Sequence, residues 1–298
     1  MRRRRSREMP DRARGALLGL AAGDALAAPL EWLHPDQIEA RFGGPLRDLV
    51  EQSPWRRGEW TDETSMALCL AESLVDKGEY DAQDAFARYA MWVRSRPRDV
   101  GADVSHALSR ARSPDEAVAA AREVEISPST PTNGCLVRAA PLALRYHDDQ
   151  GALDRFARAD AALTDHEPQA AEACLWFDMT LAALVAGRRR PTSTSFVAAH
   201  ADEAIGAAPG QLAAEVRESP ARVLTALRVG FAAAFGQDTF EHAVVFAANL
   251  GGDADANAAV AGALAGARFG AEAIPERWLD PLLDRARIAG LAVRLLRR

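Results

Sequence analysis

Two short segments of the sequence carry the residue types of a metal site. They are Trp60–Thr64 (WTDET) and Gly251–Asn257 (GGDADAN), and together they hold the acids Asp62, Glu63, Asp253 and Asp255. Two bare carboxylates about 4 Å apart repel by about 4 kcal/mol at an effective dielectric of about 20, so such a cluster needs a cation. Carboxylate oxygens suit the hard ions Mg²⁺ and Mn²⁺, and four acids are enough for two adjacent ions. The absence of clustered His and Cys argues against zinc.

Each segment also has a purely local explanation. Thr and Asp directly before an apolar helical run are ordinary N-caps, and acids in a first turn complement the helix dipole. Capping alone explains either segment taken singly. The metal interpretation therefore depends on the two helix starts lying side by side.

The surrounding sequence predicts helices. Apolar residues recur at helical spacing in Thr64–Val75, Val223–Phe235 and Phe240–Ala248, and Gly251–Asn257 leads into a small-residue helix that ends near Gly270. Strand patterns are nearly absent. Glycines at positions 15, 19 and 23 and at 262, 266 and 270 form two ridges that favour close helix packing. We expect an all-α, single-domain compact multi-helix bundle over residues 13–298, with a metal site at helix N-termini, after a basic disordered tail at residues 1–12.

Composition narrows the class of protein. The formal charge of −6 argues against sequence-specific nucleic-acid binding driven by phosphate neutralisation. Three widely spaced cysteines imply no disulfide framework and fit the reducing cytoplasm. The basic start and the apolar stretch Gly15–Ala28 are similar to a signal peptide, but Asp24 interrupts the apolar run, which is also too short and polar to span a membrane. We expect a cytoplasmic monomer with no membrane association.

Five segments resemble the ADP-ribosylglycohydrolase family, which includes dinitrogenase reductase-activating glycohydrolases and ADP-ribosylarginine hydrolases. The segments are Gly15–Trp32, Gly58–Leu70, Thr132–Leu144, Thr164–Ala173 and Asn249–Gly270. The resemblance implies an all-helical fold that binds two Mg²⁺ or Mn²⁺ ions. It also implies a hydrolase that cleaves the glycosidic bond between ADP-ribose and an acceptor.

The resemblance assigns metal and catalytic roles to individual residues. The implied metal-binding residues are Thr61, Asp62, Glu63, Asp253 and Asp255. Glu31 is implied as a catalytic or substrate-gripping glutamate, and Asp99 as a carboxylate near the reacting ribose or a metal-bound water. Both have simpler alternatives, a solvated helix end for Glu31 and a turn-capping aspartate for Asp99.

Further residues are implied as substrate contacts. Asn133 and Gly134 resemble a loop that cradles a diphosphate, although Asn-Gly alone indicates only a turn. His166 occupies the place of a family histidine near the site, against the alternative of a structural histidine. Gly251 and Gly252 are the remaining predicted substrate contacts, while Asp24 is expected to order the site rather than bind metal.

The sequence departs from the family pattern at the metal motifs. Glu63 stands where Asp is usual, and Ala256 stands where a hydroxyl normally completes a metal shell, so we expect one tight and one weak metal site. The leading hypothesis is an active hydrolase of protein ADP-ribosyl-arginine or a small ADP-ribose conjugate. The alternatives are a catalytically weakened or noncatalytic ADP-ribose-binding or structural homologue, and a hydrolase of a different nucleotide-sugar conjugate.

Overall fold

The computed structural model describes residues 2–124 and 131–297, and no strand forms in either range. The helices that contribute most to the core are α1 (Arg2–Ala27), α3 (Asp62–Lys77), α9 (Pro168–Val185), α12 (Val223–Gly236), α13 (Phe240–Ala248) and α14 (Ala254–Phe269). Around them lie α2 (Pro35–Phe42), α4 (Ala82–Arg94), α5 (Ala102–Leu108), α6 (Pro114–Ala121), α7 (Ala140–Arg145), α8 (Gln150–Ala161), α10 (Phe196–Glu203), α11 (Pro209–Glu218), α15 (Glu276–Leu279) and α16 (Arg285–Leu295). Three 3-10 turns complete the described chain: η1 (Ala28–Leu30), η2 (Val137–Ala139) and η3 (Ala271–Ala273). The predicted all-α, single-domain fold is confirmed.

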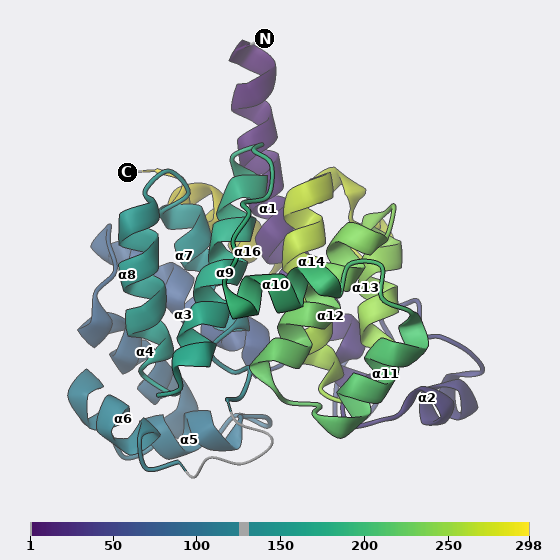
Figure 1. Ribbon diagram of the computed structural model, residues 1–298, viewed down its shortest axis with the longest axis horizontal. Coiled ribbons are helices and arrows are strands. Elements are labelled where there is room, and N and C mark those ends of the chain that lie inside the picture. Colours follow the sequence, from purple (N-terminus) through teal and green to yellow (C-terminus); the bar gives the residue numbers. More distant parts are fainter. Residues whose placement is uncertain (1, 125–130, 298) are drawn as a thin grey trace.

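Helices α1 and α14 pack together at the centre of the fold along their glycine ridges (Figure 1). A Cβ atom added to Gly19 would lie 2.2 Å from the carbonyl oxygen of Gly262, and one added to Gly15 would lie 2.1 Å from that of Gly266. Real Cβ atoms do not approach a carbonyl so closely, so the small residues are what let these backbones meet. The structure agrees with the expectation that the glycine ridges allow close helix packing, and it shows that the two helices pack against each other. Helices α12 and α13 pack against the other sides of α14.

The start of α1 differs from the predicted disordered tail. The structure has one helix from Arg2 onward, and its N-terminal turns project beyond the rest of the fold (Figure 1). Met9 packs against the core, and Arg12 Nη1 donates a hydrogen bond to the Leu184 carbonyl at 3.1 Å. These contacts order the last turns before Ala13, where burial begins.

Among the described residues, no single helix is long and apolar enough to cross a membrane. One bent pair, Glu8–Leu30 with Pro35–Phe42 at 84°, has the required length and composition. Residues 15–30 of that pair are all buried inside the protein, so their apolar character is accounted for by the core.

One acidic side chain in the core has no partner. Asp178 of α9 is fully buried, and neither of its carboxylate oxygens accepts a hydrogen bond among the described residues. Burial, and then repulsion by Asp160, raises the pKa of Asp178 well above its usual range. An unpaired buried carboxylate costs free energy whenever it ionises.

We therefore expect Asp178→Asn to raise the free energy of unfolding at about pH 8 by about 1–3 kcal/mol. Folded Asp178 keeps its proton to a higher pH than unfolded Asp178, so the stability it contributes falls as pH rises above the ordinary carboxyl range. The advantage of the variant should be small at about pH 4 and grow with pH. Urea unfolding of the wild type and the variant at both pH values measures this difference in the free energy of unfolding. An equal difference at the two pH values would mean that ionisation of Asp178 does not affect stability.

Candidate active site

A cavity of about 720 Å³ opens where the N-terminal ends of α3 and α14 meet. Its acidic lining residues are Glu31, Asp62, Glu63, Asp99, Asp103, Glu123, Asp253 and Asp255. Trp32, Asn133 and Gly134 also line it. The two acidic segments of the sequence, about two hundred residues apart, therefore face one space.

Five of the carboxylates in this cavity form two groups of three that share one member. Glu31, Asp253 and Asp255 offer oxygens that all lie within 4.8 Å of one another, and so do Asp62, Asp99 and Asp255. Asp255 belongs to both groups, which makes it the link between two adjoining places for a cation. All ligand atoms in both groups are carboxylate oxygens, the donors that Mg²⁺ and Mn²⁺ prefer.

Asp24 of α1 sets the start of α3. Its fully buried carboxylate accepts hydrogen bonds from the backbone N–H groups of Thr61 and Thr64, both at 2.9 Å, and from the Thr64 hydroxyl. Burial raises the pKa of Asp24 to about 6. The Thr61 hydroxyl in turn accepts from the Glu63 N–H at 3.4 Å as an N-cap. These bonds aim Asp62 into the cavity and agree with the expectation that Asp24 orders the site.

Glycines place Glu31 beside the start of α14. Gly251 and Gly252 have φ angles of 72° and 64°, in the left-handed region. The Gly252 N–H donates to the Leu33 carbonyl at 2.9 Å, and the Trp32 N–H donates to the Gly252 carbonyl at 2.6 Å. A Cβ on Gly251 would lie 2.1 Å from the Leu33 carbonyl oxygen. Neither glycine is in the cavity lining, so their visible role is to allow this close backbone approach.

Backbone and amide contacts hold two other acids in place. The Asn133 side-chain amide donates to Asp253 Oδ2 at 3.0 Å, and the Gly101 N–H donates to Asp62 Oδ2 at 3.2 Å, which ties the loop carrying Asp99 to α3. The segment after Gly134 leads into a short apolar helix. It begins with the 3-10 turn η2 and continues in the six-residue helix α7, which has Pro141 in its first turn.

The acids strongly perturb one another. Burial raises the pKa of Glu31 to about 8, and repulsion by Asp99 and Asp253 adds to the shift. Burial likewise raises the pKa of Asp62 to about 7, with repulsion by Asp99 next in importance. The pKa of buried Asp255 also lies well above its usual range. A site of this kind must take up either protons or cations.

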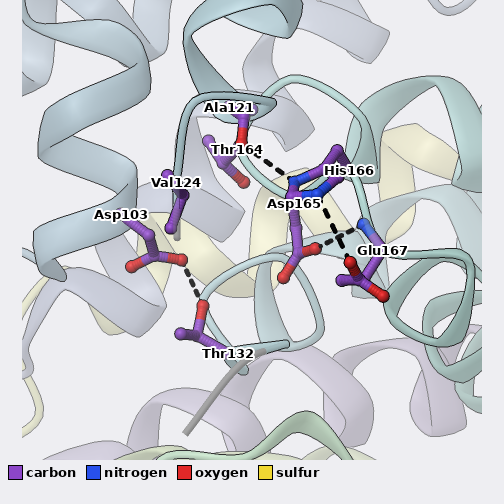
Figure 2. A pocket seen from close by; sticks show the side chains of 8 residues that line it. All are labelled: Asp103, Ala121, Val124, Thr132, Thr164, Asp165, His166 and Glu167. Atoms are coloured by element: carbon purple, nitrogen blue, oxygen red, sulfur yellow. Dashed lines mark hydrogen bonds and ion pairs between the residues drawn. The ribbon is translucent and has the colours of Figure 1, made fainter. Parts of the chain in front are cut away.

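Two predicted metal-binding residues, Thr61 and Glu63, and the predicted substrate contact His166 lie outside the two carboxylate groups. Glu63 is buried in the cavity wall but offers no atom to either group, and Thr61 lies outside the cavity lining. His166 lies in a small neighbouring pocket that shares Asp103 and Thr132 with the main cavity (Figure 2). Its Nδ1 lies 3.0 Å from the Ala121 carbonyl oxygen, and its Nε2 lies 3.3 Å from the Glu167 carboxylate.

Sequence reasoning did not single out Trp32 and Asp103 as cavity residues. Trp32 is 57% exposed and has a φ of 62°, an uncommon angle for a non-glycine residue. The only signal for it is its place directly after Glu31. Asp103 accepts a hydrogen bond from the Thr132 hydroxyl at the cavity wall (Figure 2), a pairing that no local pattern predicts.

Comparison with known proteins shows the family of the chain. The family model for ADP-ribosylglycohydrolase matches residues 5–298, so the chain belongs to this family of glycosidic-bond hydrolases. The chain is 33% identical to the ADP-ribosyl-[dinitrogen reductase] glycohydrolase of Rhodospirillum rubrum, with 91% of this chain and 90% of that protein covered. It is 32% identical to the ADP-ribosylarginine hydrolase Tri1 of Serratia proteamaculans, with coverage of 97% and 80%. A solved structure described as an ADP-ribosylglycohydrolase-related protein complex matches with a TM-score of 0.76 and 33% identity, covering 98% of this chain and 99% of that one.

Proposed function

We propose that the chain is a metal-dependent hydrolase that cleaves the bond between ADP-ribose and the arginine side chain of a modified protein. The observation that carries the proposal is the pair of carboxylate groups joined by Asp255 at the wall of a 720 Å³ cavity. Two relatives at 32–33% identity are named for ADP-ribosyl glycohydrolase or ADP-ribosylarginine hydrolase activity. The second name supports arginine as the acceptor. We place the enzyme in the cytoplasm as a monomer acting on ADP-ribosylated proteins or small ADP-ribose conjugates.

The residues present fit two hard divalent cations. Glu31, Asp253 and Asp255 would hold one Mg²⁺ or Mn²⁺ ion, and Asp62, Asp99 and Asp255 the other. Thr61 and Glu63 remain additional candidates at the same helix start. Bound ions would polarise the ribose hydroxyls and lower the pKa of a bound water. Ala256 is fully buried and offers no ligand atom, so we expect one of the two ions to bind weakly.

The chain's own residues supply orientation and charge. Asn133 and Gly134 line the cavity where the resemblance places the diphosphate. Breaking the glycosidic bond leaves positive charge on the anomeric carbon, and we expect the carboxylate oxygens of Glu31 and Asp99 that are not used by a cation to stabilise that charge.

Incubation with ADP-ribosyl-arginine and Mg²⁺ or Mn²⁺ tests the proposal, with free ADP-ribose as the readout. We expect turnover that stops when EDTA removes the ions and returns when they are restored. ADP-ribose binding without turnover would favour a noncatalytic binding protein on the same scaffold. Turnover that persists in EDTA would overturn the metal-dependent mechanism.

A further inference from the structure

A second cavity, of about 230 Å³, adjoins the carboxylates on the side of α3 and α4. We call it the tryptophan pocket and define it by Trp55, Glu59, Trp60, Trp92 and Arg98, together with Asp62 and Asp99. Asp62 and Asp99 also line the large cavity. The two spaces therefore meet at one of the two carboxylate groups.

A different pocket adjoins the large cavity near the Asn133–Gly134 loop. This small His166 pocket shares Asp103, Val124 and Thr132 (Figure 2) with the large cavity. Thr132 directly precedes the Asn133–Gly134 loop proposed for the diphosphate. A substrate whose diphosphate lies at that loop and whose ribose lies at the carboxylates would direct its acceptor away from the loop. The tryptophan pocket shares Asp62 and Asp99 with the large cavity but contains no residue of the loop, so we assign the acceptor to it. This step rests on the proposed function.

The tryptophan pocket already holds one guanidinium group, that of Arg98. The Arg98 guanidinium carbon lies 5.0 Å from the centre of a Trp55 ring, and its Nη1 lies 3.1 Å from Glu59 Oε1. Indole faces and carboxylates are the two partners that guanidinium groups favour. The Arg98 side chain is 43% exposed, and the empty volume remains beside it, next to Trp60 and Trp92.

The rest of the pocket favours a second planar cation. Glu59 pairs with Arg98 at the pocket wall. Asp62 and Asp99 lie at the inner end of the pocket, where they are also proposed to hold a cation, so the aromatic side chains are the main attraction for a planar cation. The Trp60 indole N–H donates to the Leu283 carbonyl at 3.1 Å, which holds that ring in place. A hydroxyl acceptor such as serine would gain little from aromatic faces, whereas a guanidinium would stack on them.

We propose that the tryptophan pocket binds the guanidinium group of the acceptor arginine and so sets the acceptor specificity of the enzyme. Trp92 lines the pocket from α4, and Glu59 carries a negative charge at the pocket wall that it shares with Arg98. We expect the contact with the acceptor guanidinium to be about equally strong in the bound substrate and in the transition state. Loss of the contact should therefore weaken substrate binding and leave the rate of the chemical step nearly unchanged.

Trp92→Ala and Glu59→Gln test the proposal separately. We expect each to raise KM for ADP-ribosyl-arginine about tenfold with little change in kcat, because one cation–aromatic or ionic contact is lost. Inhibition by free ADP-ribose should not change, which shows that the protein is folded and the large cavity intact. The matched control is Met91→Ala on the same helix, since Met91 is 70% exposed and lies outside the pocket lining.

Agmatine, a free guanidinium compound, gives a readout that does not depend on turnover. It should quench the tryptophan fluorescence of the wild type and of Met91→Ala at the same concentrations, and bind about tenfold more weakly to Trp92→Ala and Glu59→Gln. Agmatine binding with this pattern in a protein that shows no turnover would support the pocket while overturning the proposed function. Turnover with unchanged KM and unchanged agmatine binding in both variants would overturn the pocket and leave the proposed function standing.

Discussion

Asp255→Asn is expected to reduce hydrolysis of ADP-ribosyl-arginine by at least about 100-fold and to abolish tight metal binding. Asp255 offers an oxygen to both carboxylate groups, so one substitution weakens both proposed ion sites. An asparagine has nearly the same size but no charge, and it leaves the buried position filled. The metal-free variant should unfold at the same temperature as the metal-free wild type or higher, because a buried carboxyl that is costly to ionise is replaced by a neutral amide.

Calorimetric titration with Mn²⁺ separates this effect from unfolding. We expect one tight and one weak site in the wild type, since Ala256 contributes no ligand, and no tight site in Asp255→Asn. Glu123→Gln is the matched control: Glu123 lines the same cavity but belongs to neither carboxylate group, so its titration should resemble the wild type. Wild-type Mn²⁺ affinity in Asp255→Asn would exclude Asp255 as the shared ligand.

The positions of the helices and of the acids at their starts follow from local patterns. The apolar periodicity of residues 64–75 corresponds to the buried face of α3, and Thr61 caps it as its residue type indicates. The glycine ridges predict that two helices approach closely, and α1 and α14 do so. Both patterns consist of residues that lie close together in the sequence, so they can be recognised in a single sequence.

Contacts between backbone segments that lie far apart in the sequence cannot be predicted from such local patterns. Glu31 lies beside Asp253 because Trp32 and Leu33 exchange hydrogen bonds with Gly252, which lies more than two hundred residues further along the chain. No periodicity in either segment predicts that pairing. The same holds for the tryptophan pocket, because Trp55 and Trp60 lie in the connection between α2 and α3, Trp92 lies in α4, and no local pattern links them.

The second large effect concerns a buried ion pair behind the Asn133–Gly134 loop. Arg138 is fully buried, and its guanidinium donates to Asp160 Oδ2 at 2.8 Å, to the Asp160 carbonyl at 2.7 Å and to the Thr164 hydroxyl at 2.8 Å. It also donates to the Gly134 carbonyl at 3.3 Å. Arg138 therefore connects the folded core to a loop that lines the active-site cavity.

Arg138→Leu is expected to lower the free energy of unfolding by about 3–5 kcal/mol, since it leaves the Asp160 carboxylate buried without its cation. The bond to Gly134 is lost as well, so the affinity for ADP-ribose should fall. Urea unfolding and ADP-ribose titration measure the two effects separately. A loss below about 1 kcal/mol would mean that the pair adds little to stability.

The double variant Arg138→Leu with Asp160→Leu separates charge burial from loop ordering. Removing both charges should recover much of the lost stability, because a buried ion pair can be replaced by apolar side chains at little net cost. The Gly134 carbonyl still lacks its donor, so ADP-ribose binding should stay weak in the stabilised protein. Recovery of both properties together would mean that Arg138 affects the cavity only through global stability, and that the Gly134 contact does not position the loop.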